Sequence, residues 1–95
     1  MTVSTRVQYG ARLMFQLALS HGSGLVFLKD IARREGLSEK YLSLIVIPLR
    51  ARGLVVSGRG MHGGYQLAKA PGQISMREIV CALEGEIGVA RPTRG

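Results

Sequence analysis

The first 20 residues carry apolar side chains at the spacing of an α-helix. One face of this helix holds Val7, Ala11, Met14, Phe15 and Ala18, and Leu13, Leu17 and Leu19 widen it. Ser4 or Thr5 can cap the start of the helix, and the glycines of His21-Gly22-Ser23-Gly24 can end it in a left-handed turn. We therefore predict a nearly fully buried helix to about Ser20, whose polar side holds Arg6, Gln8, Arg12 and Gln16.

A second and a third helix are predicted on either side of a tight turn. Leu25–Leu28 is a short apolar run that could add a brief strand, and Lys29–Glu35 then forms a short helix that ends at Gly36. The hydroxyl of Ser38 can cap a third helix from Glu39 to about Arg52. Two helices joined by so short a turn form a helix-turn-helix.

The third predicted helix has apolar residues on both sides. The inward face contains Leu42, Ile45, Val46 and Leu49, whereas the outward face contains Lys40, Ser43, Leu44 and Ile47. Leu44 and Ile47 are unusual on a solvated face. We favour a contact with a protein partner or the core, and keep as the alternative a contact with thymine methyl groups in a DNA groove.

The segment Leu54–Leu67 has the pattern of a β-hairpin. Two short strand-like runs flank Gly60, Gly63 and Gly64, and the loop carries Arg59 and His62 without an acidic residue. A two-stranded ribbon is marginal alone in water, so Val55 and Leu67 must pack against the helices.

A fourth helix is predicted from the capping-box spacing of Ser75-Met76-Arg77-Glu78. Its apolar face contains Ile79, Val80 and Leu83, and Cys81 is expected to pack beside them as a small hydrophobic residue. We expect Gly85 to end this helix. Residues 1–85 then form one domain, and residues 86–95 form a flexible tail.

The positive charge of the chain is concentrated in its middle. The net charge is +7 over 95 residues, and no acidic residue lies between Glu39 and Glu78. The basic residues of this stretch are Lys40, Arg50, Arg52, Arg59, Lys69 and Arg77. Such a field suits nucleic acid, although a solvated basic surface is the alternative. RNA is less favoured than DNA, because single-strand binders interleave basic and aromatic residues and only 5% of this chain is aromatic.

Other classes of function find little support in the residues. His21, His62 and Cys81 lack the spacing of a catalytic or metal site, so we expect no enzyme and no bound metal. The single cysteine indicates a reducing, cytoplasmic compartment, and no apolar run has the length of a membrane span.

Several segments of the chain together resemble one protein family. They are Ser4-Thr5-Arg6, Ser38-Glu39-Lys40-Tyr41-Leu42, Pro48 to Val55, Arg59-Gly60 with Gly63-Gly64-Tyr65, and Ile74 to Gly85. This pattern, over roughly residues 1–85, resembles the Rrf2 family of bacterial transcription regulators. The resemblance implies a mainly α-helical winged helix-turn-helix with a small β-hairpin, acting as a homodimeric repressor on double-stranded DNA. The third helix would enter the major groove and the hairpin, as the wing, the minor groove.

The resemblance also indicates which residues contact DNA. Ser38, Lys40, Tyr41 and Arg59 are carried over by position, whereas Arg6, Ser43 and His62 are candidates because of their place on the predicted elements. For Arg6 an ordinary solvated arginine is the favoured alternative. Arg59 would enter the minor groove, whose narrow form concentrates negative potential. The structural alternative is that Tyr41 and Tyr65 are half-buried packing residues.

Two departures from the family pattern limit what is carried over. Ser43 stands where several members have an acidic residue, so no operator sequence follows. Iron–sulfur members hold a cluster with three cysteines before a long dimerisation helix, and this sequence has neither, so we expect no cluster and leave dimerisation open. A protein-interaction module on a winged-helix scaffold remains the alternative function.

Overall fold

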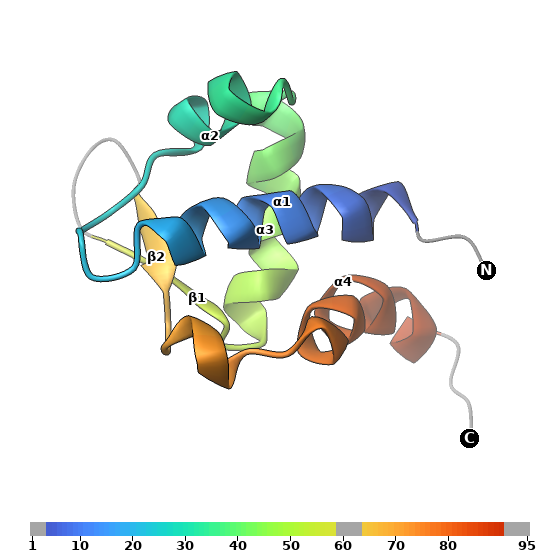
Figure 1. Cartoon of the computed structure of the whole chain (residues 1–95). Helices are drawn as coiled ribbons and strands as arrows, with labels where there is room; N and C mark the ends of the chain where they lie inside the picture. The colour runs from blue at the N-terminus through green and yellow to red at the C-terminus, as the bar shows by residue number, and fades with distance from the viewer. Residues whose placement is uncertain (1–3, 59–63, 91–95) are drawn as a thin grey trace.

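The chain forms four α-helices, one short 3-10 helix and a two-stranded hairpin. The computed structural model describes residues 4–58 and 64–90, with only the backbone described for 85–90. In chain order the elements are α1 (Thr5–Leu19), α2 (Leu28–Glu35), α3 (Glu39–Ala51), β1 (Val55–Ser57), β2 (Tyr65–Leu67), η1 (Pro71–Gln73) and α4 (Met76–Ala90), as Figure 1 shows. This order confirms the predicted helical fold with a helix-turn-helix followed by a hairpin. Within the described residues, no helix is long and apolar enough to cross a membrane.

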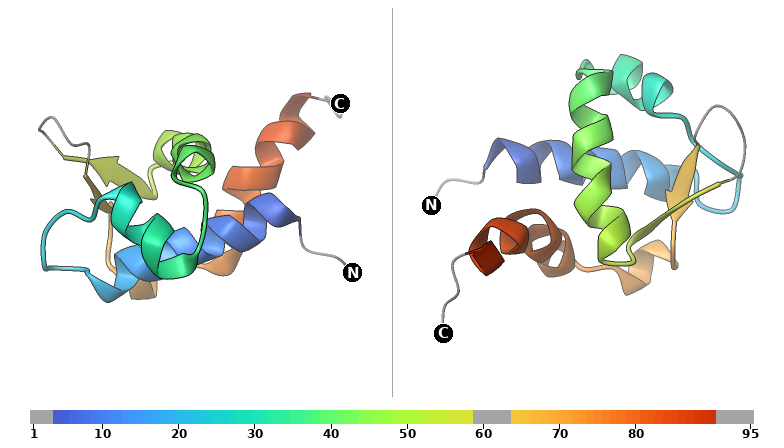
Figure 2. Two further views of the ribbon diagram at one scale, coloured as in Figure 1. Left: turned by 90° about the horizontal axis from the view of Figure 1, so that it is seen from above. Right: turned by 180° about the vertical axis from the view of Figure 1, so that it is seen from behind.

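The third helix lies across α1, with α2 at one end and the hairpin at the other (Figure 2). Its predicted inward face is confirmed, since Leu42, Ile45, Val46 and Leu49 are at most 1% exposed. Leu13 and Leu17 of α1 and Leu83 of α4 are equally buried in the same core. Burial of such aliphatic side chains is the main force that holds the four helices together.

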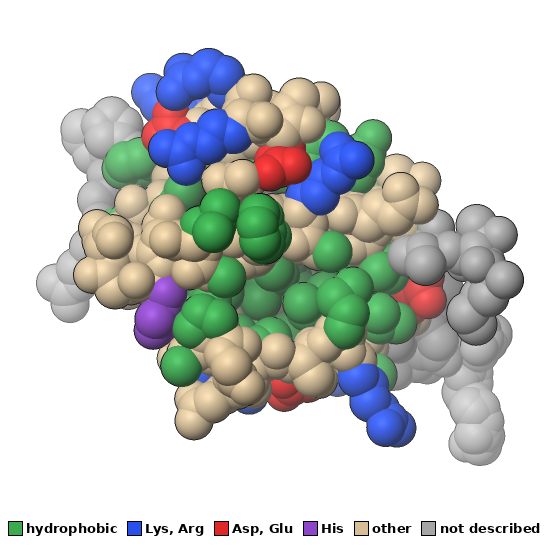
Figure 3. Space-filling model, in the orientation of Figure 1, with side chains coloured by type: hydrophobic (Ala, Val, Ile, Leu, Met, Phe, Trp, Pro, Cys, Tyr) green, Lys and Arg blue, Asp and Glu red, His purple; other side chains and the backbone are tan. Residues whose placement is uncertain are grey.

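The buried face of α1 differs from the predicted one. Phe15 and Leu19 are 58% and 64% exposed, so the prediction of a nearly fully buried helix is wrong. The buried face instead passes through Gly10, where a side chain would collide with Leu83 of α4. Phe15 instead faces outward. Figure 3 shows hydrophobic side chains gathered on this side of the molecule.

Gln16 is the buried polar residue of α1, although it was predicted on the polar side. Its side-chain amide nitrogen donates a hydrogen bond to Glu35 Oε2 at 2.6 Å, and its Oε1 accepts one from Arg34 Nη1 at 3.4 Å. Only 8% of the residue remains exposed. A buried amide is tolerated where its hydrogen bonds are made, so Gln16 joins α1 to the end of α2.

The fourth helix is longer than predicted, because it continues through Gly85 to Ala90. Residues 86–90 are therefore helical, whereas a loose tail was expected there, and residues 91–95 lie outside the described part. A glycine inside a helix costs only about 1 kcal/mol, and Leu83, Ile87 and Ala90 continue the helical spacing beyond it. Cys81 is exposed, which corrects the prediction that it packs inward; Ala82 occupies the buried position instead.

The predicted capping box at the start of α4 is confirmed. The backbone N–H of Glu78 donates to Ser75 Oγ at 3.1 Å, and the backbone N–H of Ser75 donates to Glu78 Oε1 at 2.9 Å. Lys69 Nζ lies 3.2 Å from the other carboxylate oxygen. The Ser75 N–H and the Lys69 ammonium stabilise the ionised form, so they hold the pKa of Glu78 below its ordinary value of 4.5.

The lowered pKa of Glu78 predicts a pH-dependent contribution to stability. A carboxylate whose pKa is lower in the folded than in the unfolded state stabilises fully above pH 4.5 and loses this effect as the pH falls through the folded-state pKa. Glu78→Gln keeps an amide that can cap the helix but removes the charge. We expect this variant to melt below the wild type at pH 7 and the difference to shrink as the pH falls below 4.5. A constant difference across this range would contradict the assignment.

Candidate nucleic-acid interface

The turn between α2 and α3 has the geometry of a helix-turn-helix. Gly36 adopts a left-handed conformation with φ 69° and ψ 34°, which ends α2 at the residue that the sequence indicated. The backbone N–H of Leu37 donates to the carbonyl of Ala32 at 2.9 Å. Ser38 then caps α3, since its Oγ accepts the backbone N–H of Tyr41 at 3.1 Å. The two helices are thus held at a fixed angle by local bonds.

The start of α3 presents two of the predicted DNA-binding residues to solvent. Ser38 and Lys40 are exposed. Ser43 is half-buried, and its hydroxyl donates to the carbonyl of Lys40 at 2.6 Å. Free backbone N–H groups and the positive end of the helix dipole make such a helix start suitable for a phosphate. Glu39 is the acidic residue of this first turn and stabilises the same dipole.

Tyr41, another predicted DNA-binding residue, packs partly against the core. It is half-buried against the core, and its ring meets the ring of Tyr9 edge-on, with centroids 5.2 Å apart and planes at 85°. This is a favoured aromatic geometry that fixes the start of α3 on α1. The alternative interpretation of Tyr41 as a packing residue therefore agrees with the structure, and Tyr65 is likewise half-buried against the core.

The outward face of α3 is apolar in its middle, as predicted. Leu44 and Ile47 are 56% and 57% exposed, so neither belongs to the core. Lys40 and Arg50 are exposed toward the two ends of the helix. Among the described elements none covers this side of α3, which faces the viewer in the right-hand view of Figure 2. The helix is therefore free to enter a groove or meet a partner.

The hairpin beside α3 is held by three segments of chain. β1 and β2 pair antiparallel with Val55 opposite Leu67 and Ser57 opposite Tyr65. Val26 forms an additional bridge with Tyr65, with both backbone hydrogen bonds at 2.8 Å. The brief strand predicted at residues 25–28 is thus a single bridge, and Leu28 already begins α2.

The tip of the hairpin contains Arg59 and His62, and both lie outside the described residues. At its base, the backbone N–H of Gly58 donates to the carbonyl of Gly64 at 2.8 Å. A side chain on Gly64 would bring its Cβ to 2.7 Å from Cβ of Leu25, and one on Gly58 would come still closer to the Leu25 side chain. No pattern in the sequence indicates that Leu25 packs against these two glycines and supports the wing.

Arg6 occupies the first turn of α1 and is half-buried. Its Nε atom is buried and has no hydrogen-bond partner within the described part of the chain. Because Nε is inaccessible, the predicted phosphate contact of Arg6 would be made by the terminal guanidinium nitrogens.

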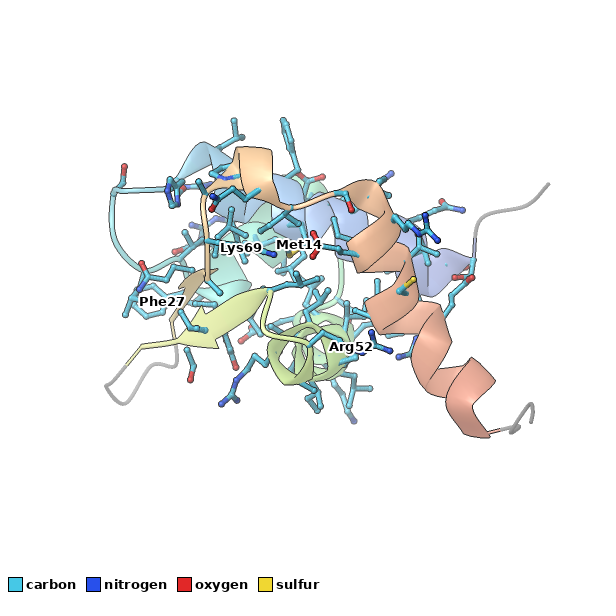
Figure 4. All side chains as sticks on the ribbon, turned by 90° about the horizontal axis from the view of Figure 1, so that it is seen from below. Met14, Phe27, Arg52 and Lys69 are labelled. Carbon is cyan, nitrogen blue, oxygen red and sulfur yellow. The ribbon has the colours of Figure 1, made fainter. Side chains whose placement is uncertain are left out.

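The exposed basic residues surround the helix-turn-helix. They are Lys29, Arg33 and Arg34 on α2, Lys40 and Arg50 on α3, Arg52 directly after it, and Arg12 and Arg77 elsewhere. Arg33 pairs with Asp30 at 2.8 Å, whereas Lys40 and Arg50 have no ion pair with any described residue. Arg52 points toward α4, whereas Lys69 lies near the start of that helix (Figure 4). The exposed cations without a described ion pair therefore include Lys40 and Arg50 of α3, whereas Asp30 and Glu35 offset much of the charge of α2.

An apolar hollow lies on another side of the molecule, between α1 and the start of α4. It is lined by Ala11, Met14, Phe15, Ala18, Leu67, Pro71, Ile74 and Ile79. None of these side chains is an acid, a base or a nucleophile. This hollow therefore offers no chemistry for catalysis.

The chain was compared with known proteins. A family model named Rrf2 and described as an iron-dependent transcriptional regulator matches residues 3–94. Over 87 residues the chain is 47% identical to the HTH-type transcriptional regulator CymR of Bacillus subtilis (strain 168), which covers 92% of this chain and 63% of that protein. It is 38% identical over 91 residues to the HTH-type transcriptional regulator IscR of Cronobacter sakazakii, covering 96% of this chain and 56% of that protein.

Solved structures share the fold. The CymR structure from B. subtilis, described as the global cysteine regulator, superimposes with a TM-score of 0.85 at 43% identity and covers all of this chain and 71% of that one. IscR of T. potens gives a TM-score of 0.83 at 49% identity, covering 90% of this chain and 63% of that one. The chain spans 56% to 63% of the length of the two curated relatives above.

Proposed function

Because the chain belongs to the Rrf2 family of transcriptional regulators, we propose that it binds specific DNA sequences and thereby regulates transcription. In this proposal α3 enters the major groove and the wing reaches the adjacent minor groove. The observation that carries it is the outward side of α3, which no described element covers and which has unpaired cations toward both ends. The family consists of regulators and not of enzymes.

The start of α3 offers a test at a described residue. Ser38→Ala removes the cap bond to Tyr41 and is expected to lower the free energy of unfolding by about 1 kcal/mol. Ser38→Asp restores a good cap but puts a negative charge where we place a phosphate. The aspartate variant should therefore unfold like the wild type and bind duplex DNA about 1 to 4 kcal/mol more weakly.

Thermal denaturation and fluorescence anisotropy on the same samples separate the two effects. If Ser38→Asp bound duplex DNA as tightly as the wild type, no phosphate would lie at this helix start. The proposed position of α3 in the major groove would then be wrong.

Arg59 is the second test, because the proposal places its side chain in the minor groove. Arg59→Ala should weaken binding to a specific site by about 1 to 3 kcal/mol and leave the melting temperature nearly unchanged. Arg12→Ala is the matched control, since it removes the same charge from an exposed position on α1. Equal affinity losses in both variants would indicate a general charge effect and contradict the wing contact.

The remaining features of the proposal rest on the family resemblance. We place the DNA-binding unit in residues 1–85, with His62 of the wing and Arg6 of α1 as further contacts. The unit would act as a homodimer on an inverted repeat, as a repressor in the bacterial cytoplasm. Analytical ultracentrifugation of the chain with and without a two-half-site duplex tests the dimer.

The family description mentions iron, but these residues do not fit an iron site. Cys81 is the single cysteine of the sequence, and it lies exposed in a hollow that Arg52 and Arg77 also line. Iron–sulfur clusters are held by several thiolates. Among the described residues, no three His, Cys, Asp or Glu side chains are placed to hold a metal. We derive no role for iron from this chain.

A further inference from the structure

The outward side of α3 carries a row of exposed side chains with an apolar centre. Lys40, Leu44, Ile47 and Ala51 are spaced by four, three and four residues, so they share one side of the helix. Leu44 and Ile47 each leave more than half of their surface in water. Exposed aliphatic groups at the centre of a proposed binding face indicate that the bound molecule has an apolar group to offer.

Hydrogen-bonding groups are scarce in the middle of this face. Ser43 is the polar neighbour of the row, and its hydroxyl is already donated to the carbonyl of Lys40. The side chains of asparagine, glutamine and arginine that read base edges by paired hydrogen bonds do not occur between Lys40 and Arg50. The centre of the helix can therefore distinguish bases chiefly by shape and apolar contact.

The charges around the row match a polyanion. Lys40 precedes Leu44 by one turn and Arg50 follows Ile47 by nearly one turn, and neither is paired with a described residue. Glu39 is the acidic residue of this helix, and it lies about 100° around the axis from Lys40. Cations at both ends of an apolar centre suit phosphates at the rims of a groove and base edges at its floor.

We infer that Leu44 and Ile47 recognise the C5-methyl groups of thymine in the major groove, an inference that rests on the proposed DNA binding. The thymine methyl is the apolar group that unmodified base pairs display in that groove. The two residues are separated by about 4.5 Å along the helix axis, which is close to the spacing of about 3.4 Å between base pairs. The contacted thymines should therefore lie at adjacent or next-adjacent positions of a half-site.

Replacing single thymines by deoxyuridine in a selected duplex tests this inference, because the replacement removes only the methyl group. At constant salt we expect about fourfold weaker binding at each of two positions, as one buried methyl predicts. Leu44→Ala should abolish the sensitivity at one position and Ile47→Ala at the other. Leu19→Ala, which truncates an equally exposed leucine on α1, should retain both.

The possible outcomes separate the inference from the proposed function. If the wild type binds the duplex with steep salt dependence but no deoxyuridine position matters, the methyl contact is wrong and DNA binding stands. If no duplex binds, the proposed function fails as well. If Leu44→Glu abolishes binding to a protein partner and leaves duplex affinity unchanged, this face is a protein-docking surface and the inference is overturned.

Discussion

Replacing Leu42 with alanine is expected to lower the free energy of unfolding by about 2 to 5 kcal/mol. Leu42 is fully buried on the inward side of α3, within the core shared by α1 and α4. Truncation removes apolar contacts and leaves a cavity that the neighbouring helices can close only partly. Since small domains have about 5 to 15 kcal/mol of stability in total, this single change should be visible as a large fall in the urea midpoint.

Leu44→Ala is the matched control for this prediction. The substitution is chemically identical and lies two residues away on the same helix, but Leu44 is 56% exposed. Its effect on the free energy of unfolding should stay within about 0.5 kcal/mol. Similar losses of unfolding free energy in both variants would mean that the inward and outward faces of α3 are assigned wrongly. The proposed contact of Leu44 and Ile47 with a DNA groove would then be wrong as well.

Raising the salt concentration fourfold, from about 50 to 200 mM, should weaken duplex binding by about 250- to 1000-fold. This estimate assumes that each protomer neutralises about four to six phosphates, which gives a log–log slope of about −4 to −5. The unpaired Lys40 and Arg50 and the cations of α2 supply the necessary charges. Fluorescence anisotropy with a labelled duplex at several salt concentrations measures the slope directly.

Single variants show which cations produce this slope. Lys40→Ala should reduce its magnitude by about one, whereas Arg12→Ala on α1 should leave it unchanged. An affinity that does not depend on salt would exclude the phosphate contacts altogether. A slope that falls equally in both variants would mean that charge acts from the whole surface and not from α3.

Local signals in the sequence predicted most of the fold. Ser38 and Ser75 begin helices, and Gly36 ends one, because capping is decided by residues within one turn. The two faces of α3 also followed from helical spacing. The same resemblance that named the family placed Ser38 and Lys40 on the exposed start of α3, as the structure has them.

The features of α1 and the hairpin that the sequence did not predict depend on contacts between distant segments of the chain. Leu83 of α4 packs against Gly10 of α1, and buried Gln16 is hydrogen-bonded to Glu35 of another helix. Spacing within α1 carries no information on either contact. The support of the wing by Leu25 is equally non-local, since it joins the segment before α2 to the hairpin glycines.

Helical spacing alone did not show whether Cys81 or Ala82 of α4 faces the core. Spacing on α4 was compatible with an inward cysteine, and the choice between positions 81 and 82 depended on where α3 and α1 lie. The end of α4 was misplaced because a glycine was treated as a stop signal. The apolar spacing of Leu83, Ile87 and Ala90 continues past this glycine, and a single glycine costs a helix only about 1 kcal/mol.

Selection from a random pool of duplexes directly tests whether α3 binds specific DNA sequences. The chain is incubated with the pool at low salt, bound duplexes are recovered and sequenced over several rounds, and the affinities of the enriched sequences are compared with scrambled versions. We expect an inverted repeat whose half-sites carry adjacent or next-adjacent thymines and which binds about 1000-fold or more tightly than the scrambled duplex. A pool that shows no enriched sequence, with equal affinity for scrambled duplexes, would contradict sequence-specific DNA binding by α3.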